Sequence, residues 1–207
     1  MDFIQIINEL EFMKFDEDYI IRKGDIPILF TAPHTMLQVH DDGSYKLGEP
    51  YTKGIALFLN KYCNVNCMIK IKDTGLDPNH DNYDEFKVEL IRFIKDNNIK
   101  LVIDLHGSSK YRDFDVELGT MNNLSADFST IKELEEAFTE NNIKNIAHNE
   151  PFKGGLITQS LYGLKDIDVI QVEINGSYRD NDNIEKLEQL CHSFEHFINQ
   201  YNKYTNR

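Results

Sequence analysis

The chain has 207 residues, of which 41% are hydrophobic, and its formal net charge is −13. This length suits one sizeable domain, and the apolar content is sufficient for a core. The acidic balance argues against nucleic acid as a partner, because binding phosphates requires an excess of Lys and Arg, and it gives no help in binding an anionic membrane surface.

The first residues, MDFIQIINELEF, lack the basic start and apolar run of a signal peptide. No window approaches the roughly 20 apolar residues that a membrane span requires. The three cysteines, Cys63, Cys67 and Cys191, are an odd set without CxxC spacing, so we expect reduced thiols and a cytoplasmic protein. The spacing of Cys63 and Cys67 makes a metal site there the less favoured interpretation.

Short runs rich in Ile and Val predict strands at residues 28–32, 68–72, 101–105, 116–120 and 169–174, with a weaker one at 19–23. Amphipathic segments predict helices at 51–62, 83–97, 130–141 and from residue 182 to about 201. Thr130 with Glu133, and Asp182 with Glu185, have the spacing of capping boxes at the starts of the last two. This alternation predicts one α/β domain over residues 1–207, with a mixed, mainly parallel sheet and helices on both faces.

Polar residues follow the predicted strands at the carboxyl ends, where sheets of this kind bind ligands. His34 and His106 each lie within two residues of a strand end, so two imidazoles can meet across adjacent strands. Together they predict a metal site that needs one further protein ligand if a water is to keep the open position. The candidates for that ligand are Glu49, Asp73, Asp77 and Asp104.

Two of these carboxylates have a competing interpretation. Glu49 precedes Pro50 at the predicted start of the 51–62 helix, where a carboxylate also serves as a plain helix-terminal group. Asp104 lies two residues before His106 and has the alternative role of accepting the second ring N–H of a metal-bound histidine.

The other histidines are less informative. His192 and His196 are four residues apart on the last predicted helix, but they point away from its apolar stripe, so a solvated surface is expected. His148 lies in a polar loop and is expected at the surface, while His40 is ambiguous.

Glu173 lies in an apolar strand context, VIQVEI, where an ionised carboxylate is costly without compensation. Gln171 is two residues earlier and therefore on the same face. A glutamate beside a metal-activated water is the general base that metal-dependent hydrolysis requires, so we assign that role to Glu173.

With these residues assembled, the chain resembles the N-formylglutamate amidohydrolase family, which is similar in fold to zinc carboxypeptidases and aspartoacylases, a phosphorylase/hydrolase-like architecture. The matching pieces occur in the family's order and cover about three quarters of the chain: APHTM at 32–36, DPNHD at 77–81, IDLHG at 103–107, FKGG at 152–155 and IQVEIN at 170–175. The resemblance implies that His34 and His106 ligate zinc, that Glu173 is the catalytic glutamate, and that Asn79 contacts the substrate's carboxylate or carbonyl.

Two departures from the carboxypeptidase pattern stand out. The third residue after His34 is Leu37 where those enzymes have a glutamate ligand, and we propose Glu49 as the substitute. The residue after Asn79 is His80 where they have an arginine. His80 is mostly uncharged at neutral pH and makes no bidentate carboxylate contact, so Arg112 or Arg179 is the alternative source of positive charge for substrate binding.

The resulting hypothesis is a zinc-dependent amidohydrolase, with another divalent metal possible, that acts on a small N-acyl (N-formyl) amino acid or peptide-like amide. Gly107, Ser108 and Ser109 are expected to leave room for the substrate. Two alternatives stay open. One is a non-catalytic protein that binds an acidic metabolite on the same fold, and the other is a metal-dependent esterase or phosphatase.

Overall fold

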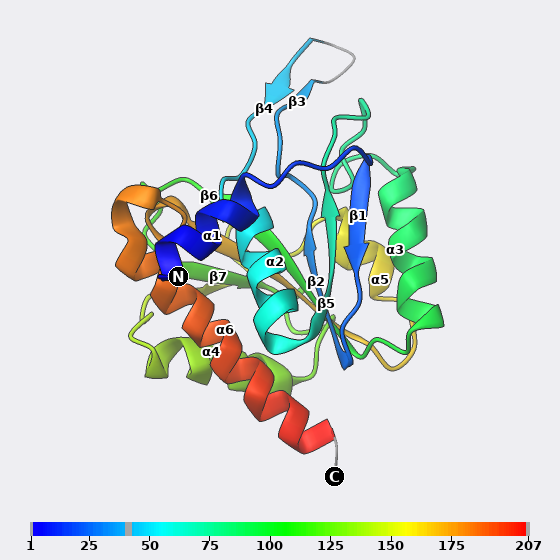
Figure 1. The fold of residues 1–207 in the computed structure, drawn as a ribbon. Coiled ribbons are helices and arrows are strands. Elements are labelled where there is room, and N and C mark those ends of the chain that lie inside the picture. Colours follow the sequence, from blue (N-terminus) through cyan, green and yellow to red (C-terminus); the bar gives the residue numbers. More distant parts are fainter. Residues whose placement is uncertain (1, 40–42, 206–207) are drawn as a thin grey trace.

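The computed structural model describes residues 2–39 and 43–205. Its main feature is a seven-stranded sheet with the order β1-β5-β2-β6-β9-β7-β8 (Figure 1). The strands are β1 (Tyr19–Arg22), β2 (Ile26–Ala32), β5 (Val65–Lys70), β6 (Leu101–Ser108), β7 (Val116–Gly119), β8 (Ile146–His148) and β9 (Asp168–Asn175). The strands β5, β2, β6 and β9 are parallel, whereas β1 and β7 run antiparallel to their inner neighbours.

Helices cover both faces of the sheet (Figure 1). One face is packed by α1 (Phe3–Glu11), α2 (Thr52–Cys63), α4 (Phe128–Glu140) and α6 (Ile184–Thr205), and the other by α3 (Glu85–Asp96) and α5 (Leu156–Leu161). The predicted α/β fold with a mainly parallel mixed sheet is therefore confirmed. Among the described residues, no helix is long and apolar enough to cross a membrane.

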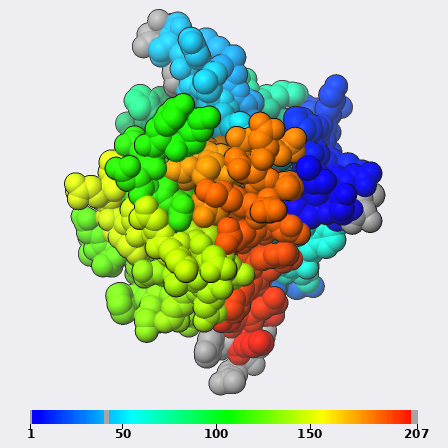
Figure 2. All heavy atoms as spheres, turned by 90° about the vertical axis from the view of Figure 1, so that its left-hand side faces the viewer, coloured from blue at the N-terminus to red at the C-terminus, as the bar shows by residue number. Residues whose placement is uncertain are grey.

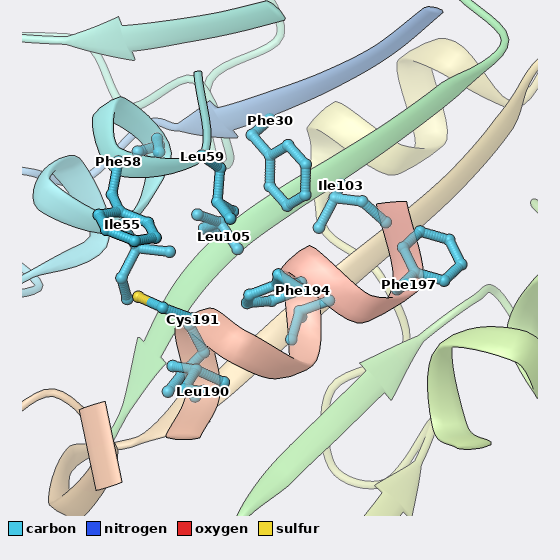
Figure 3. Packing of buried hydrophobic residues seen from close by; sticks show 14 of the residues in the cluster. Phe30, Ile55, Phe58, Leu59, Ile103, Leu105, Leu190, Cys191, Phe194 and Phe197 are labelled. Atoms are coloured by element: carbon cyan, nitrogen blue, oxygen red, sulfur yellow. The ribbon is translucent and has the colours of Figure 1, made fainter. Parts of the chain in front are cut away.

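The larger core lies between the sheet and the helices α2 and α6 (Figure 3). Phe30 of β2 meets Phe194 of α6 edge to face, with ring centroids 5.4 Å apart, and Phe138 of α4 packs against the same ring at 5.3 Å. Edge-to-face contacts of this kind add to the stabilisation that burial of the rings provides. This side of the sheet is apolar along the full length of its central strands.

The opposite face changes character along the strands. In β6, Leu101, Ile103 and Leu105 face the larger core, while Val102, Asp104 and His106 alternate with them and face the other side. Val102 packs under α3 and α5, but the polar residues of this set lie beyond them, toward the carboxyl end. The register continues this division across the sheet, because Asp104 pairs with Gln171, and His106 pairs with Glu173.

Several short elements were not expected from the sequence. Helix α1 follows an N-cap at Asp2, whose carboxylate accepts a hydrogen bond from the Gln5 amide at 2.9 Å. Helix α5 has six residues, β8 has three, and β3 (Gln38–Val39) and β4 (Tyr45–Lys46) have two each, which is too few for a recognisable period. The β3–β4 hairpin projects from the rest of the molecule at the carboxyl end of the sheet (Figures 1 and 2).

Both predicted capping boxes are wrong. Helix α4 begins at Phe128, so Thr130 lies inside it, and the Thr130 hydroxyl donates to Asp168 at 2.6 Å. The chain before α6 forms a short 3-10 turn at Asn181–Asn183, in which the Asp180 carboxylate accepts from the Asp182 amide. The N-cap of α4 is Asp127, whose side chain makes no capping hydrogen bond, and the capping carboxylate before α6 is Asp180, two residues earlier than the box pattern indicates.

Candidate metal centre

Two histidines from different strands meet at the carboxyl end of the sheet. His34 follows the end of β2, and His106 lies near the end of β6. Both side chains are almost fully buried, and their Nδ1 atoms lie 3.1 Å apart. The structure therefore brings together the two imidazoles that are 72 residues apart in the sequence.

Glu49 completes a cluster of three possible ligands. Its carboxylate oxygens lie 3.2 Å from His34 Nδ1 and 3.5 Å from His106 Nδ1. One ligand atom from each residue lies within 4.8 Å of the others. The backbone fixes this position, because the Glu49 amide donates to the His34 carbonyl at 2.7 Å, and the Gly107 amide donates to Glu49 Oε2 at 3.0 Å. Helix α2 begins at Thr52, so Glu49 precedes its first turn.

The other nitrogen of each ring faces a carboxylate. His34 Nε2 lies 2.7 Å from Asp77 Oδ1, and His106 Nε2 lies 2.9 Å from Asp104 Oδ2. Asp104 is fully buried and also accepts the Thr31 hydroxyl at 2.6 Å. A carboxylate on one ring nitrogen directs the lone pair of the other toward a metal, as in carboxylate–histidine–zinc groups. Asp77 and Asp104 thus lie behind the histidines.

The charges of this cluster shift its pKa values. Burial raises the pKa of Glu49, but the charge and hydrogen bond of His106, and then those of His34, outweigh it and hold the pKa well below the usual range. Burial also raises the pKa of Asp77, but the hydrogen bond and charge of His34 outweigh it, so the pKa of Asp77 is lowered. Despite burial, Asp104 and Glu49 raise the pKa of His106. Because a ligating histidine must be neutral, metal binding has to release this proton.

A positively charged group already lies against the cluster. Lys46, at the end of β4, places its Nζ 2.8 Å from His34 Nδ1, 3.6 Å from Glu49 Oε1 and 3.9 Å from Asp77 Oδ2. A cation thus fits against this set of groups, and two imidazoles with one carboxylate are a donor set that suits zinc. The sequence interpretation missed Lys46, because a lysine in a polar loop has the pattern of a surface residue.

Glu173 lies next to His106 across the sheet, in the register pair between β6 and β9. Gln171 Nε2 donates to Glu173 Oε1 at 2.8 Å, and Gln171 Oε1 accepts from the Gly155 amide at 2.6 Å. Burial raises the pKa of Glu173, and the nearby Glu49 carboxylate adds to this, while His106 and Gln171 act against it. The carboxylate is thus oriented by an amide and is more basic than an exposed glutamate.

A hollow of about 360 Å³ opens beside these groups. It is lined by Lys46, Glu49, Asn79, His106, Gly107, Gln171, Glu173 and residues 151–155. Asn79 enters the wall with its Oδ1 accepting from the Ile157 amide at 3.0 Å and its Nδ2 3.3 Å from His106 Nε2. The candidate base Glu173, two of the possible metal ligands, Glu49 and His106, and the predicted substrate contact Asn79 therefore share one hollow.

Three of the predicted substrate contacts do not line this hollow. The His80 side chain is 79% exposed and lies beside Asp81. The exposed Arg112 lies over the ring of Phe152, 5.2 Å from its centroid. Arg179 is buried and donates to three backbone carbonyls, those of Ile174, Pro50 and Ser108, at 2.9 to 3.1 Å. The guanidinium N–H groups of Arg179 therefore join three backbone segments and are not free for a ligand.

Two further expectations need correction. A side chain at Gly107 would lie 2.3 Å from the Arg179 guanidinium carbon, so this glycine leaves room for Arg179, whereas the sequence suggested room for the substrate. Asp73, a candidate ligand, is exposed and accepts the Val39 amide at 2.8 Å, which ties the β3–β4 hairpin to the loop after β5.

The remaining histidines lie elsewhere. His192 is exposed, and His196 is half-buried with its Nε2 2.7 Å from Gln200 Nε2. His148 is exposed near Glu135, at 3.7 Å. His40 falls outside the described residues. The three cysteines are free, and none of them belongs to the one possible metal cluster found among the described residues.

Glu117 was missed by the sequence interpretation. It is fully buried on β7, directly opposite Glu173 of β9, and its Oε1 accepts the Phe152 amide at 2.8 Å. The residue thereby holds the loop that forms one wall of the hollow. An acidic residue within the run VELG is a signal of the same kind as Glu173 in VIQVEI, and it could have been found in the same way.

Comparison with known proteins agrees with this architecture. The sequence model of the family "N-formylglutamate amidohydrolase" matches residues 79–178. The fold matches N-formylglutamate amidohydrolase from Ralstonia eutropha JMP134 with a TM-score of 0.63 and 14% identity over 92% of this chain and 98% of that one. No curated protein matches the sequence.

Two further solved structures share the fold. A bacteriophage poly-gamma-glutamate hydrolase matches with a TM-score of 0.56 and 12% identity over 94% of each chain. A metallo-carboxypeptidase from Burkholderia cenocepacia matches with a TM-score of 0.54 and 11% identity over 86% of this chain and 57% of that one. The resemblance predicted from the sequence, to the N-formylglutamate amidohydrolase family and to a carboxypeptidase-like fold, is thereby confirmed.

Proposed function

We propose that the protein is a metal-dependent amidohydrolase that cleaves a small N-acyl amino acid or a peptide-like amide. The family match and the hydrolase fold support hydrolysis of an amide bond. The observation that carries the proposal is the convergence of His34, Glu49 and His106 at the carboxyl end of the sheet, where Glu49 and His106 line one hollow together with Glu173.

His34, Glu49 and His106 would hold the metal, with zinc the first candidate. When bound, such an ion supplies activation of a water molecule near neutral pH and polarisation of the substrate carbonyl. Asp77 and Asp104 orient the two rings from behind, and their charges make the imidazoles better donors.

Glu173 acts as the general base and then as the acid. It removes a proton from the attacking water, whose oxygen forms the new bond to the acyl carbon. It then delivers that proton to the amine nitrogen as the carbon–nitrogen bond breaks, so that the products are a carboxylate and a free amine. Its raised pKa suits both transfers, because a proton held too weakly would not reach the leaving nitrogen.

Asn79 supports the developing negative charge. Its side-chain amide lies in the wall of the hollow near His106, and its oxygen is occupied by the Ile157 amide, which leaves the NH₂ group as the donor. A donor aimed at the developing oxyanion contributes about 3–4 kcal/mol to lowering the barrier. Gln171 fixes the Glu173 carboxylate, and residues 151–155 form one wall of the hollow.

The test is amide hydrolysis by the zinc-loaded protein on a panel of N-formyl and N-acetyl amino acids, with the wild type and Glu173→Gln compared. We expect turnover by the wild type and a fall in kcat of about 10²- to 10⁴-fold in the variant. The metal content of both should be equal, which separates a lost base from a lost metal. Full activity of Glu173→Gln would contradict the mechanism.

The same panel separates the alternatives. Binding of an N-acyl amino acid without turnover by the metal-loaded wild type would favour a binding protein. Faster hydrolysis of p-nitrophenyl esters or phosphates than of any amide in the panel would favour an esterase or phosphatase. Either result would refute the amidohydrolase proposal.

A further inference from the structure

Lys46 is a charged group at the candidate metal centre to which the proposed mechanism gives no role. Its Nζ lies 2.8 Å from His34 Nδ1 and 3.6 Å from Glu49 Oε1, which is the same corner at which a metal ion would meet these two residues. Its side chain is 37% exposed, so one side of it borders open space.

A divalent cation and the Lys46 ammonium group repel each other and cannot share this corner. The repulsion between like charges a few ångströms apart is strong in a partly buried site, because little water screens it. Metal binding between His34 and Glu49 therefore requires the Lys46 side chain to move away.

The surroundings of Lys46 allow that movement. It ends β4, a strand of two residues in the projecting β3–β4 hairpin (Figure 1). Its register partner is Gln38, whose buried side-chain amide has no hydrogen-bond partner among the residues that the structure describes. No hydrogen bond of the Gln38 side chain to a described residue therefore opposes a shift of Lys46. The Val39 amide of the same hairpin is held by Asp73 at 2.8 Å, so the movement is that of the Lys46 side chain and not of the whole hairpin.

The hollow is the space into which Lys46 can turn, since Lys46 already forms part of its wall. Binding of an anionic substrate in the hollow would also require a positively charged group. Glu49 and Glu173 both line it, and an anionic substrate would be repelled by them. Among the residues that the structure describes, its lining contains two lysines, Lys46 and Lys153, and no arginine. Arg179 donates to backbone carbonyls, and Arg112 lies on the ring of Phe152.

We propose that Lys46 is a movable cation with two positions. In the metal-free protein its ammonium group neutralises the corner between His34 and Glu49. With the metal bound, it faces the hollow and binds the carboxylate of an anionic substrate. This inference rests on the proposed function and adds to it the residue that would bind a negative charge on the substrate, Lys46 of β4.

The first measurement is zinc affinity, by competition with a chromophoric chelator, for the wild type, Lys46→Met and the control Lys165→Met. Lys165 is 91% exposed and lies outside the hollow. Loss of the competing charge should tighten zinc binding by Lys46→Met about tenfold, and the control should match the wild type. Equal or weaker binding by a folded Lys46→Met protein would overturn the proposal.

The second measurement is formate release from an N-formyl amino acid and from its α-carboxamide counterpart. In Lys46→Met, the ratio of kcat/KM for the carboxylate to that for the carboxamide should fall about tenfold, and Lys46→Arg should restore part of it. An unchanged ratio would overturn the proposal. Hydrolysis of neither substrate by the zinc-loaded wild type would refute the proposed function itself. If Lys46→Met does not fold, Lys46→Gln serves as the neutral variant.

Discussion

The two ends of the sheet both carry a hollow, and the larger one is not the candidate site. The hollow at the amino ends measures about 760 Å³ and that at the carboxyl ends about 360 Å³. The larger hollow is lined by polar residues as well, among them Lys100, Asp127, Asp166 and Asp168. Size and polarity therefore do not distinguish the two.

The difference is in what the charged groups do. At the amino end, Asp168 accepts the Asp127 amide at 3.0 Å and the Thr130 hydroxyl at 2.6 Å, so its carboxylate holds the start of α4 in place. At the carboxyl end, His34, Glu49 and His106 direct donor atoms at one another. Buried groups that face a common point, and need a cation to be satisfied, are the better indicator of a site than volume.

The largest expected effect concerns the metal ligands. His34→Ala and His106→Ala each remove one of three donors, so bound zinc should fall at least about a hundredfold at a fixed free concentration. His192→Ala and His196→Ala, which remove imidazoles from α6, should bind zinc as the wild type does. Metal analysis after dialysis, with circular dichroism as a check of folding, makes this measurement.

The ligand variants and the α6 controls together also define the result that would contradict this prediction. Full zinc content in a folded His106→Ala protein, or loss of zinc in His192→Ala, would place the metal elsewhere and remove the distinction between the two ends of the molecule.

A smaller effect on zinc affinity is expected for Asp104, which contacts the proposed ligand His106. Asp104→Asn weakens the hold on His106 Nε2 and should lower zinc affinity about 10- to 100-fold. Asp168→Asn makes the same chemical change at the amino end of the sheet and should leave zinc affinity unchanged, although it should lower thermal stability because it perturbs the contacts to α4. Calorimetric titration with zinc measures the first effect, and equal affinity of the two variants would contradict it.

Much of this architecture follows from local sequence patterns. The run LVIDLHGS predicts both a strand and a polar end, because its apolar residues alternate with Asp104 and His106 on the face that helices leave uncovered. Glu173 was recognisable for the same reason. In each case the signal is a residue whose charge is costly in its own strand.

The parts that could not be predicted depend on contacts between distant segments. Nothing local shows that Lys46 reaches His34, since β3 and β4 have two residues each. Nothing local shows that Arg179 is occupied by carbonyls from three segments, so an arginine near a motif had the pattern of a substrate contact. The roles of Lys46 and Arg179 therefore become apparent only in the folded structure.

The third prediction concerns the stability of the carboxyl end. Arg179→Met removes the donors to three backbone carbonyls and should lower the free energy of unfolding by about 3 kcal/mol. Arg92→Met, at a 68% exposed side chain, should change it by less than about 0.5 kcal/mol. Urea denaturation measures both. A stable Arg179→Met protein with a raised KM would instead make this arginine a substrate contact.

The smallest expected effect is a shift of the pH profile. Glu173 must be deprotonated to act as a base, so activity rises with pH through its pKa, which burial already places above 4.5. Gln171 donates to this carboxylate and lowers its pKa. Gln171→Leu removes a hydrogen bond to the charged form, worth about 1.5 kcal/mol, so the acidic limb of kcat should move up by about one pH unit.

Asp168→Asn changes a residue at the start of the same strand, β9, whose carboxylate contacts the start of α4, so it serves as the control and should leave the limb in place. Metal binding also weakens at low pH because histidines take up protons, so the profiles are measured at saturating zinc. A limb that stays fixed in Gln171→Leu would mean that the group titrating in the profile is not Glu173, because Glu173 is the carboxylate to which the Gln171 amide donates.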